Sequence, residues 1–182
     1  MSLSKGQYGA GSASIEYNPN RPRYVRITDI NDDGSLNNDF VSSENLQDDS
    51  DYKLEYGDFL FARTGATVGK TYCYEKGDEI FAGYLIRFRL NTNKIIPKYM
   101  YWYTKTEQYL NWVRLNQSGA AQPGINEKKY SNLIVLVPPI NKQKIFIEFV
   151  KQCDKLKFIV QQRIDLLNEL LNTKMHEYFD EE

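Results

Sequence analysis

The stretch from Asn141 to Tyr178 reads NKQKIFIEFVKQCDKLKFIVQQRIDLLNELLNTKMHEY and contains neither proline nor glycine. Its apolar residues return at steps of four and three, at Phe149, Cys153, Leu156, Val160, Ile164, Leu167, Leu171, Met175 and Tyr178. The same face returns every eleven residues, and such a repeat keeps one stripe on one side of a nearly straight helix. At ~1.5 Å per residue this helix extends about 55 Å, more than a small domain is expected to cover. The stretch therefore predicts a long helix whose stripe packs against something else.

This apolar stripe has two interpretations. The helix could fold back onto its own domain, as terminal helices often do, or it could pair with a second helix. The stripe is narrow and sustained, and its flanks are charged, with Lys151, Lys155, Lys157, Arg163, Asp165, Glu169 and Lys174. Narrow sustained seams are typical of helix pairs, so we favour an interaction arm. The residues predicted to carry dimerisation are Phe149, Leu156, Val160, Ile164, Leu167 and Leu171.

Length and composition fit one globular domain followed by this arm. The chain has 182 residues, of which 41% are hydrophobic and 14% aromatic. No apolar run approaches the ~20 residues that a membrane span requires, and the polar N-terminal stretch does not resemble a signal peptide. Cys73 and Cys153 lie far apart and form no redox or metal motif. We therefore expect a reduced cytoplasmic protein.

The pattern before the arm predicts a mixed α+β domain over residues 1–140, with the helical arm over 141–182. Expected strands are Tyr24–Ile30, Phe59–Ala62, Lys70–Tyr74, Gly83–Leu90 and a fully buried Leu133–Val137. The aromatic run from Lys98 to Leu115 fits a helical face, and packing is the favoured role of its rings. Residues 5–23 are expected to be irregular, 31–34 to form a turn, and 35–56 to be mostly loop or short helix.

Catalytic and metal chemistry are not indicated by the motifs. The run Gly65 to Thr71 resembles a phosphate-binding loop, but it is one residue short between its glycines and leads into a strand. The single histidine, His176, has no ligand partner at metal-binding spacing. No nucleophile and base are paired. By elimination we predict a binding protein.

Charge is unevenly distributed although the net charge is only −1. Acids dominate from Asp29 to Asp58, where Lys53 is the single cation, and cations outnumber acids from Phe59 to Tyr130. This distribution permits a local cationic face on a nearly neutral protein.

Several landmarks occur in an order that resembles the specificity subunit of type I DNA restriction–modification systems, over nearly the whole chain. They are Tyr8-Gly9, Tyr24 to Ile30 with Gly34, Gly57 to Lys70 (GDFLFARTGATVGK), Gly83 to Phe88 (GYLIRF), Gln122 to Asn126 (QPGIN) and Val137 to Gln143 (VPPINKQ). The Gly57–Lys70 segment and the Pro-Pro-Ile start of the long helix are the most specific of these.

The resemblance implies a non-catalytic protein that binds double-stranded DNA. Such subunits carry two target-recognition domains joined by two helices in an antiparallel coiled coil, and they hold methylating subunits and a restriction subunit. Methyl transfer from S-adenosylmethionine belongs to the methylating subunit, so no cofactor is expected in this chain. With one domain and one helix, the chain resembles half a subunit. As a hypothesis, two copies pair antiparallel as a homodimer and read an inverted repeat.

The residues expected to contact DNA lie in two glycine-containing loops and beside them. The first loop offers Arg63, Thr64, Thr67 and Lys70 to phosphates, and the second offers Gln117, Ser118, Gln122 and Asn126 to base edges or phosphates. Nearby charge is expected from Arg21, Arg23, Lys128 and Lys129. Two alternatives stay open at this point. One is a recognition module from a larger methyltransferase–endonuclease polypeptide, and the other is a coiled-coil adaptor that does not bind DNA.

Overall fold

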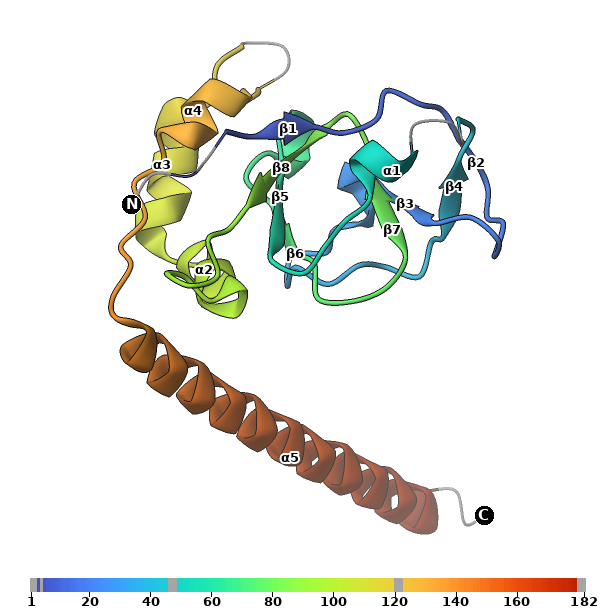
Figure 1. Ribbon diagram of the computed structural model, residues 1–182. Helices are drawn as coiled ribbons and strands as arrows, with labels where there is room; N and C mark the ends of the chain where they lie inside the picture. The colour runs from blue at the N-terminus through green and yellow to red at the C-terminus, as the bar shows by residue number, and fades with distance from the viewer. Residues whose placement is uncertain (1–2, 4, 46–48, 120–122, 180–182) are drawn as a thin grey trace. The chain divides into compact units, whose positions relative to one another are not determined.

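The computed structural model describes residues 3, 5–45, 49–119 and 123–179. The chain divides into two compact units, Met1–Ile140 and Asn141–Glu182. The first unit contains strands, short helices and the hydrophobic core, and the second is a single long helix (Figure 1). The strand-rich unit and the long helix together make the α+β class that the sequence predicts.

A four-stranded antiparallel sheet forms the centre of the first unit. Its order is β1-β8-β5-β6, with β1 at Gln7–Tyr8, β8 at Leu85–Arg89, β5 at Asp58–Ala62 and β6 at Thr71–Cys73. Successive side chains of a strand point to opposite faces, and in β5 both faces are apolar. Phe59 and Phe61 enter one core cluster, whereas Leu60 and Ala62 enter another. The predicted hairpin over 59–74 is confirmed by the pairing of β5 with β6.

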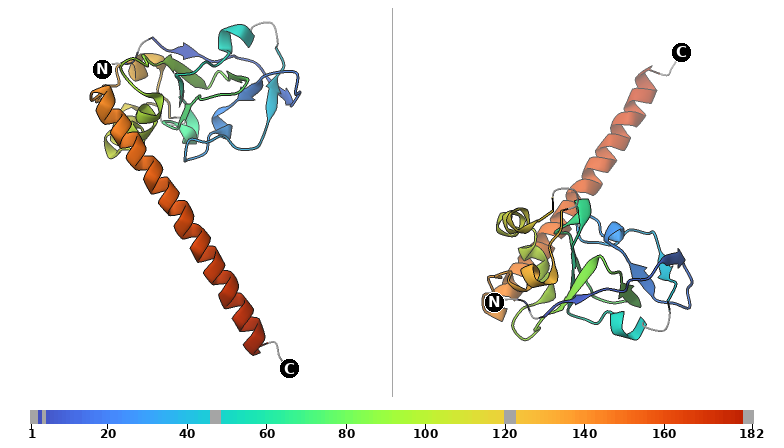
Figure 2. Two further views of the ribbon diagram at one scale, coloured as in Figure 1. Left: turned by 60° about the horizontal axis from the view of Figure 1, so that its bottom comes forward. Right: turned by 90° about the horizontal axis from the view of Figure 1, so that it is seen from above.

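Three helices pack on the face of the sheet that carries Phe61 (Figures 1 and 2). They are α2 at Pro97–Tyr103, α3 at Glu107–Asn116 and α4 at Glu127–Ser131. The Phe61 ring lies 4.6 Å from that of Tyr130, 5.6 Å from that of Phe88 and 6.4 Å from that of Tyr109 between centroids. The aromatic residues of the α2–α3 region therefore serve packing, as favoured from the sequence.

The opposite face of the sheet is covered by shorter elements. Strand β3 (Arg23–Val25) pairs in parallel with β7 (Glu79–Phe81), and β2 (Ser14–Glu16) pairs antiparallel with β4 (Val41–Ser43). A 3-10 turn, η1, spans Ile27–Asp29, and a short helix, α1, spans Asp49–Tyr52. Strands β1 and β2 lie within residues 5–23 and β4 within 35–56, so both stretches are more ordered than predicted.

The strand predicted for Tyr24–Ile30 ends at Val25. The carboxylate of the fully buried Asp29 accepts a hydrogen bond from the backbone N–H of Arg26 at 2.7 Å and pairs with its guanidinium at 2.7 Å. These bonds turn the chain into η1. The turn predicted at 31–34 is confirmed, with Gly34 at a φ of 75°.

The aromatic run from Lys98 to Leu115, which fits a helical face in the sequence, forms two helices, α2 and α3. Thr104 ends α2, and the hydroxyl of Thr106 caps α3 by accepting the N–H of Tyr109 at 3.3 Å. A threonine hydroxyl at an N-cap replaces a bond that the preceding turn would otherwise supply.

The fully buried strand predicted at Leu133–Val137 is wrong. This segment is extended without strand pairing, and only Leu133 and Val135 are buried, whereas Ile134 is 73% exposed. The carbonyls of Ile134 and Leu136 accept bonds from the hydroxyls of Tyr103 and Tyr99 instead of from a neighbouring strand.

Helix α5 runs from Ile140 to Phe179 without a break, which confirms the predicted long helix. Its 40 residues correspond to about 60 Å at ~1.5 Å per residue. The apolar stripe is exposed over most of this length, with Leu156 at 61% and Leu167 at 63%. Within the described residues, no helix combines the length and apolar character needed to cross a membrane.

The loop between β5 and β6 contains two glycines with positive φ in different surroundings. A Cβ at Gly69 (φ 87°) would lie 2.8 Å from a methyl group of Val113 on α3, whereas a Cβ at Gly65 (φ 71°) would meet open space. Helix α3 can therefore pack on this loop only because residue 69 has no side chain.

Gly69→Ala and Gly65→Ala form a matched pair that tests this packing. We expect Gly65→Ala to lower the free energy of unfolding by about 1–2 kcal/mol, from backbone strain alone. Gly69→Ala adds an overpacking cost of about 1–3 kcal/mol against α3. Urea denaturation of both variants measures the difference, and equal losses would contradict the close approach of α3.

Candidate nucleic-acid interface

Backbone hydrogen bonds join the loop after β5 to the loop after α3. The N–H of Gly65 donates to the carbonyl of Pro123 at 3.0 Å, and the N–H of Ile125 donates to the carbonyl of Arg63 at 2.9 Å. Ser118 and Gly124 exchange backbone bonds at 3.0 and 3.1 Å. The two stretches predicted to contact DNA are therefore one surface, although more than forty residues separate them in the sequence.

Two tyrosines anchor this surface to the core. The hydroxyl of Tyr130 donates to the carbonyl of Ala62 at 2.9 Å, and that of Tyr109 donates to the carbonyl of Gly69 at 2.8 Å. Both side chains are fully buried, and burial raises the pKa of each phenol. They stay neutral donors, so the two ends of the 63–69 loop are fixed.

Several polar side chains of the first loop bond to other groups of the chain. The hydroxyl of Thr67 donates to the carbonyl of Thr64 at 3.2 Å. The ammonium group of Lys70 pairs with Asp32 at 2.8 Å and holds the pKa of that carboxyl below its usual range. Lys70 thus fastens the 31–34 turn, and Arg63 is the remaining cation of the loop.

The second loop leads directly into α4. Asn126, exposed, caps this helix by accepting the N–H of Lys129 at 3.0 Å. The ammonium group of Lys129 donates to the carbonyl of Asn116 at 2.7 Å and to the hydroxyl of Ser118 at 3.2 Å. Gln117, Ser118 and Lys128 are exposed beside it, and Gln122 lies outside the described residues.

Arg21 and Arg23 lie in a different part of the domain, beside β4 and the segment before it. Arg23 is 8% exposed, donates to the carbonyl of Asn37 at 2.7 Å and lies 4.2 Å from the ring centre of Phe40. Arg21 donates to the carbonyl of Ser43 at 3.3 Å. The structure does not bring these two arginines to the joined loops, and a DNA contact by either stays a prediction.

Sequence reasoning missed two tyrosines beside Arg63. The ring centre of Tyr8 lies 4.9 Å from the guanidinium carbon of Arg63, and the N–H of Arg63 donates to the carbonyl of Tyr84 at 3.0 Å. Both rings reach solvent, with Tyr8 at 40% and Tyr84 at 56% exposure. Tyr8-Gly9 and Gly83-Tyr84 were visible only as landmarks, because nothing local indicates that they adjoin residue 63.

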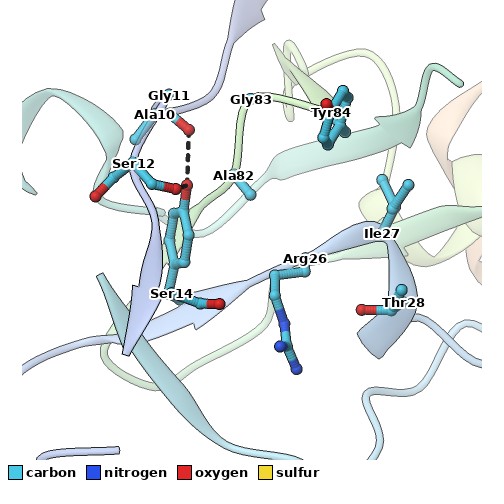
Figure 3. A pocket seen from close by; sticks show the side chains of 11 residues that line it. Ala10, Gly11, Ser12, Ser14, Arg26, Ile27, Thr28, Ala82, Gly83 and Tyr84 are labelled. Atoms are coloured by element: carbon cyan, nitrogen blue, oxygen red, sulfur yellow. Dashed lines mark hydrogen bonds between the residues drawn. The ribbon is translucent and has the colours of Figure 1, made fainter. Parts of the chain in front are cut away.

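A pocket of about 730 Å³ opens next to Tyr84. Ser12 and Ser14 lie along one wall, and Ile27, Thr28 and Tyr84 lie along the opposite one (Figure 3). The guanidinium of Arg26, which also lines it, is paired with Asp29 and Asp39 at 2.7 Å each. The charge of Arg26 is thus neutralised within the chain, and none of the other described residues that line the pocket is a lysine or arginine that could hold a phosphate. Elsewhere among the described residues, no group of three or more His, Cys, Asp or Glu side chains could hold a metal ion.

Comparison with known proteins identifies a family. The family described as type I restriction modification DNA specificity domain matches residues 10–169. The StySPI type I restriction enzyme specificity subunit of Salmonella potsdam is 24% identical over 173 residues, covering 89% of this chain and 37% of that subunit. A Methanocaldococcus jannaschii chain assigned as the MjaX specificity subunit is 26% identical over 145 residues, covering 77% and 34%. The chain therefore spans about a third of the length of these relatives.

Solved structures share the fold. The HsdS subunit of Thermoanaerobacter tengcongensis aligns with a TM-score of 0.64 at 13% identity, over 95% of this chain and 49% of that one. The S subunit of a type I restriction–modification system from M. genitalium aligns with a TM-score of 0.59 at 13% identity, over 98% and 44%.

Glu127 ties the N-terminal strand to α4 and gives this surface a pH dependence. Its carboxylate accepts hydrogen bonds from Ser131 at 2.7 Å and from the N–H of Gly6 at 2.8 Å, and these bonds lower its pKa. Since the pKa is lower in the folded chain than in the unfolded one, the carboxylate stabilises the fold above the unfolded value of about 4.3. That contribution is lost as the pH falls through the folded pKa.

We expect Glu127→Gln to lower the melting temperature at pH 6–7 and to have progressively less effect toward pH 3. Thermal unfolding across this range measures the difference from the unaltered chain. Glu44→Gln, at an exposed glutamate, removes the same charge as a control. A decrease in melting temperature of Glu127→Gln that does not change with pH would contradict a stabilising role of the ionised Glu127 carboxylate.

Proposed function

The chain belongs to the family of type I restriction–modification DNA specificity domains, and from this premise we propose that it is a sequence-specific DNA-binding specificity subunit. In this role it directs methylating and restriction subunits to their target and catalyses nothing itself. Methyl transfer from S-adenosylmethionine takes place on the methylating subunit, and cleavage on the restriction subunit. The family match over residues 10–169, most of the chain, is the observation that carries this proposal.

The DNA-binding face in this proposal is the surface made by the two joined loops. Arg63 and Lys128 supply cations for phosphates or bases, and the exposed side chains of Gln117, Ser118 and Asn126 supply amide and hydroxyl groups for base edges. Thr64, Thr67, Lys70 and Lys129 hold the loops in place through bonds within the chain. This division between residues that contact DNA and residues that hold the loops in place is expected where a rigid scaffold presents loop residues to a ligand.

With a net charge of −1, the chain has little general attraction for DNA. Binding by the isolated chain should therefore be weak and strongly dependent on salt. Tight binding then requires the partner subunits.

Helix α5 is proposed as the arm through which two copies pair antiparallel. The stripe is nearly symmetrical about the point between Arg163 and Ile164. The pairs Val160 and Leu167, Leu156 and Leu171, and Phe149 and Tyr178 each lie at equal distances from this point. Two copies running in opposite directions would therefore face each other with the same apolar sequence.

The charge distribution along α5 favours the same orientation. Six cations and two acids lie within residues 141–163, whereas three acids and one lysine lie within 164–179. Antiparallel pairing places each basic half beside an acidic half, and parallel pairing places like charges together. A second apolar row, Ile159, Leu166 and Leu170, lies beside the first and is also exposed. It leaves apolar surface for a further subunit.

Two alternatives predict different behaviour. A recognition module from a larger polypeptide would carry its catalytic part on the same chain. A coiled-coil adaptor would pair through α5 without binding DNA.

The first prediction is a dimer that depends on the stripe. In light scattering we expect the chain to have twice its 21.3 kDa mass, and Leu156→Asp and Leu167→Asp to be monomers, because a charge in the seam is desolvated on pairing. Gln162→Asp, on the opposite side of the helix, should stay dimeric. A monomeric unaltered chain, or a dimer that survives both substitutions, would contradict the proposal that two copies pair through α5.

The second prediction concerns DNA. By fluorescence anisotropy with a mixed-sequence duplex, we expect the affinity to fall steeply between 50 and 200 mM salt. Lys128→Gln should weaken binding and reduce the slope of log K against log salt by about 1. Lys76→Gln, which removes an exposed cation from the turn between β6 and β7, should leave both unchanged. No binding at 50 mM salt, or equal effects of the two substitutions, would contradict the proposed face.

A further inference from the structure

The backbone of Arg63 is fixed on both sides. Its N–H donates to the carbonyl of Tyr84 at 3.0 Å, and its carbonyl accepts the N–H of Ile125 at 2.9 Å. The preceding residue, Ala62, is fully buried and accepts the hydroxyl of Tyr130. The side chain therefore starts from a fixed point at the end of β5, although the residue belongs to a loop.

The guanidinium of Arg63 has a platform but no acceptor. It stacks on the ring of Tyr8 at 4.9 Å, and its Nε is buried without a hydrogen-bond partner. No hydrogen bond or ion pair joins this side chain to the described part of the chain. Arg26, Arg87, Arg89 and Arg114, by contrast, all pair with carboxylates.

This arrangement is unfavourable unless an acceptor comes from outside. A partly desolvated charge without hydrogen bonds destabilises the fold, and the chain places such a charge beside the exposed polar groups of the second loop. The terminal nitrogens of an arginine form a planar fork that matches two neighbouring acceptors. The missing partner is thus a pair of oxygen or nitrogen acceptors in one plane.

Tyr8 is itself held in place. It pairs with Ile86 between β1 and β8, and its hydroxyl accepts the N–H of Glu127 at 3.1 Å. A ring fixed in this way restricts the arginine to one direction through cation–π contact. A fixed direction favours recognition of a base edge. A phosphate, in contrast, can be contacted by a flexible side chain such as that of Lys128.

We propose that Arg63, oriented by Tyr8, donates to O6 and N7 of one guanine in the DNA target, and that Tyr8 is a positioning residue for this contact. The bidentate pair of arginine with guanine is the commonest base-specific contact in the major groove. The inference rests on the proposed function and adds to it the base that is read and the residue that orients the reader.

Selection from a random-sequence duplex pool tests it, with the bound fraction sequenced for each variant. The unaltered chain should enrich a motif with one guanine preferred by about 5- to 150-fold over other bases. Arg63→Lys should lose that preference at this position and keep the others, because an ammonium group cannot form the fork. Tyr8→Leu should lose it in part, and Tyr8→Phe, which keeps the ring, should retain it.

Arg89→Lys is the matched control, since Arg89 pairs with Glu55 and Asp58 inside the chain, and it should leave the motif unchanged. Thermal unfolding verifies that each variant is folded. If Arg63→Lys is unstable, Tyr8→Leu still tests the inference, because it removes only a partly exposed ring. Uniform weakening over all sequences by Arg63→Lys would mean a phosphate contact and would overturn the inference. So would an unchanged guanine preference in both Arg63→Lys and Tyr8→Leu. The selection is run at 50 mM salt, where the proposed function predicts binding by the isolated chain. A pool with no enriched motif for the unaltered chain under these conditions would overturn the proposed function, and the inference with it.

Discussion

Two hydrogen bonds from buried tyrosines to the ends of one loop determine how this domain presents its surface. Tyr130 holds the carbonyl of Ala62 and Tyr109 holds that of Gly69, so the segment between β5 and β6 is fixed at both ends. The rings of these tyrosines belong to the aromatic core around Phe61. The same side chains thus stabilise the core and position the loop, and buried carbonyls without such donors would be costly.

The joined loops follow from this anchoring. Helices α3 and α4 carry the two tyrosines, and the second loop connects those helices. Packing both helices on β5 therefore brings their connection to the end of the strand, where backbone bonds link it to Arg63 and Gly65. Sheet, helices and loops form one structure, in which a core substitution at Phe61 would also disturb the proposed DNA-binding face.

Local sequence patterns were sufficient to predict those elements whose structure is determined by local interactions. The eleven-residue repeat predicted α5, and alternation with bracketing glycines predicted the β5–β6 hairpin. Non-local interactions explain most of the differences. The segment 133–137 depends on tyrosine hydroxyls in place of a partner strand, and β2–β4 and β3–β7 pair over long separations. The break at Thr104–Thr106 instead depends on a local cap that the apolar pattern does not reveal. At the candidate site, the sequence identified both loops but not their union, the pairing of Lys70 with Asp32, the burial of Arg23 or the platform under Arg63.

The central claim is that the surface made by the 63–69 loop and the loop between α3 and α4 is where DNA binds. Hydrogen–deuterium exchange of the chain with and without a mixed-sequence duplex at low salt tests it most directly. The account predicts slower exchange on DNA addition in peptides covering 63–69 and 116–128, and no change in peptides covering the acidic 31–58 segment. Protection that is absent from these two loops, or confined to other parts of the domain, would contradict it.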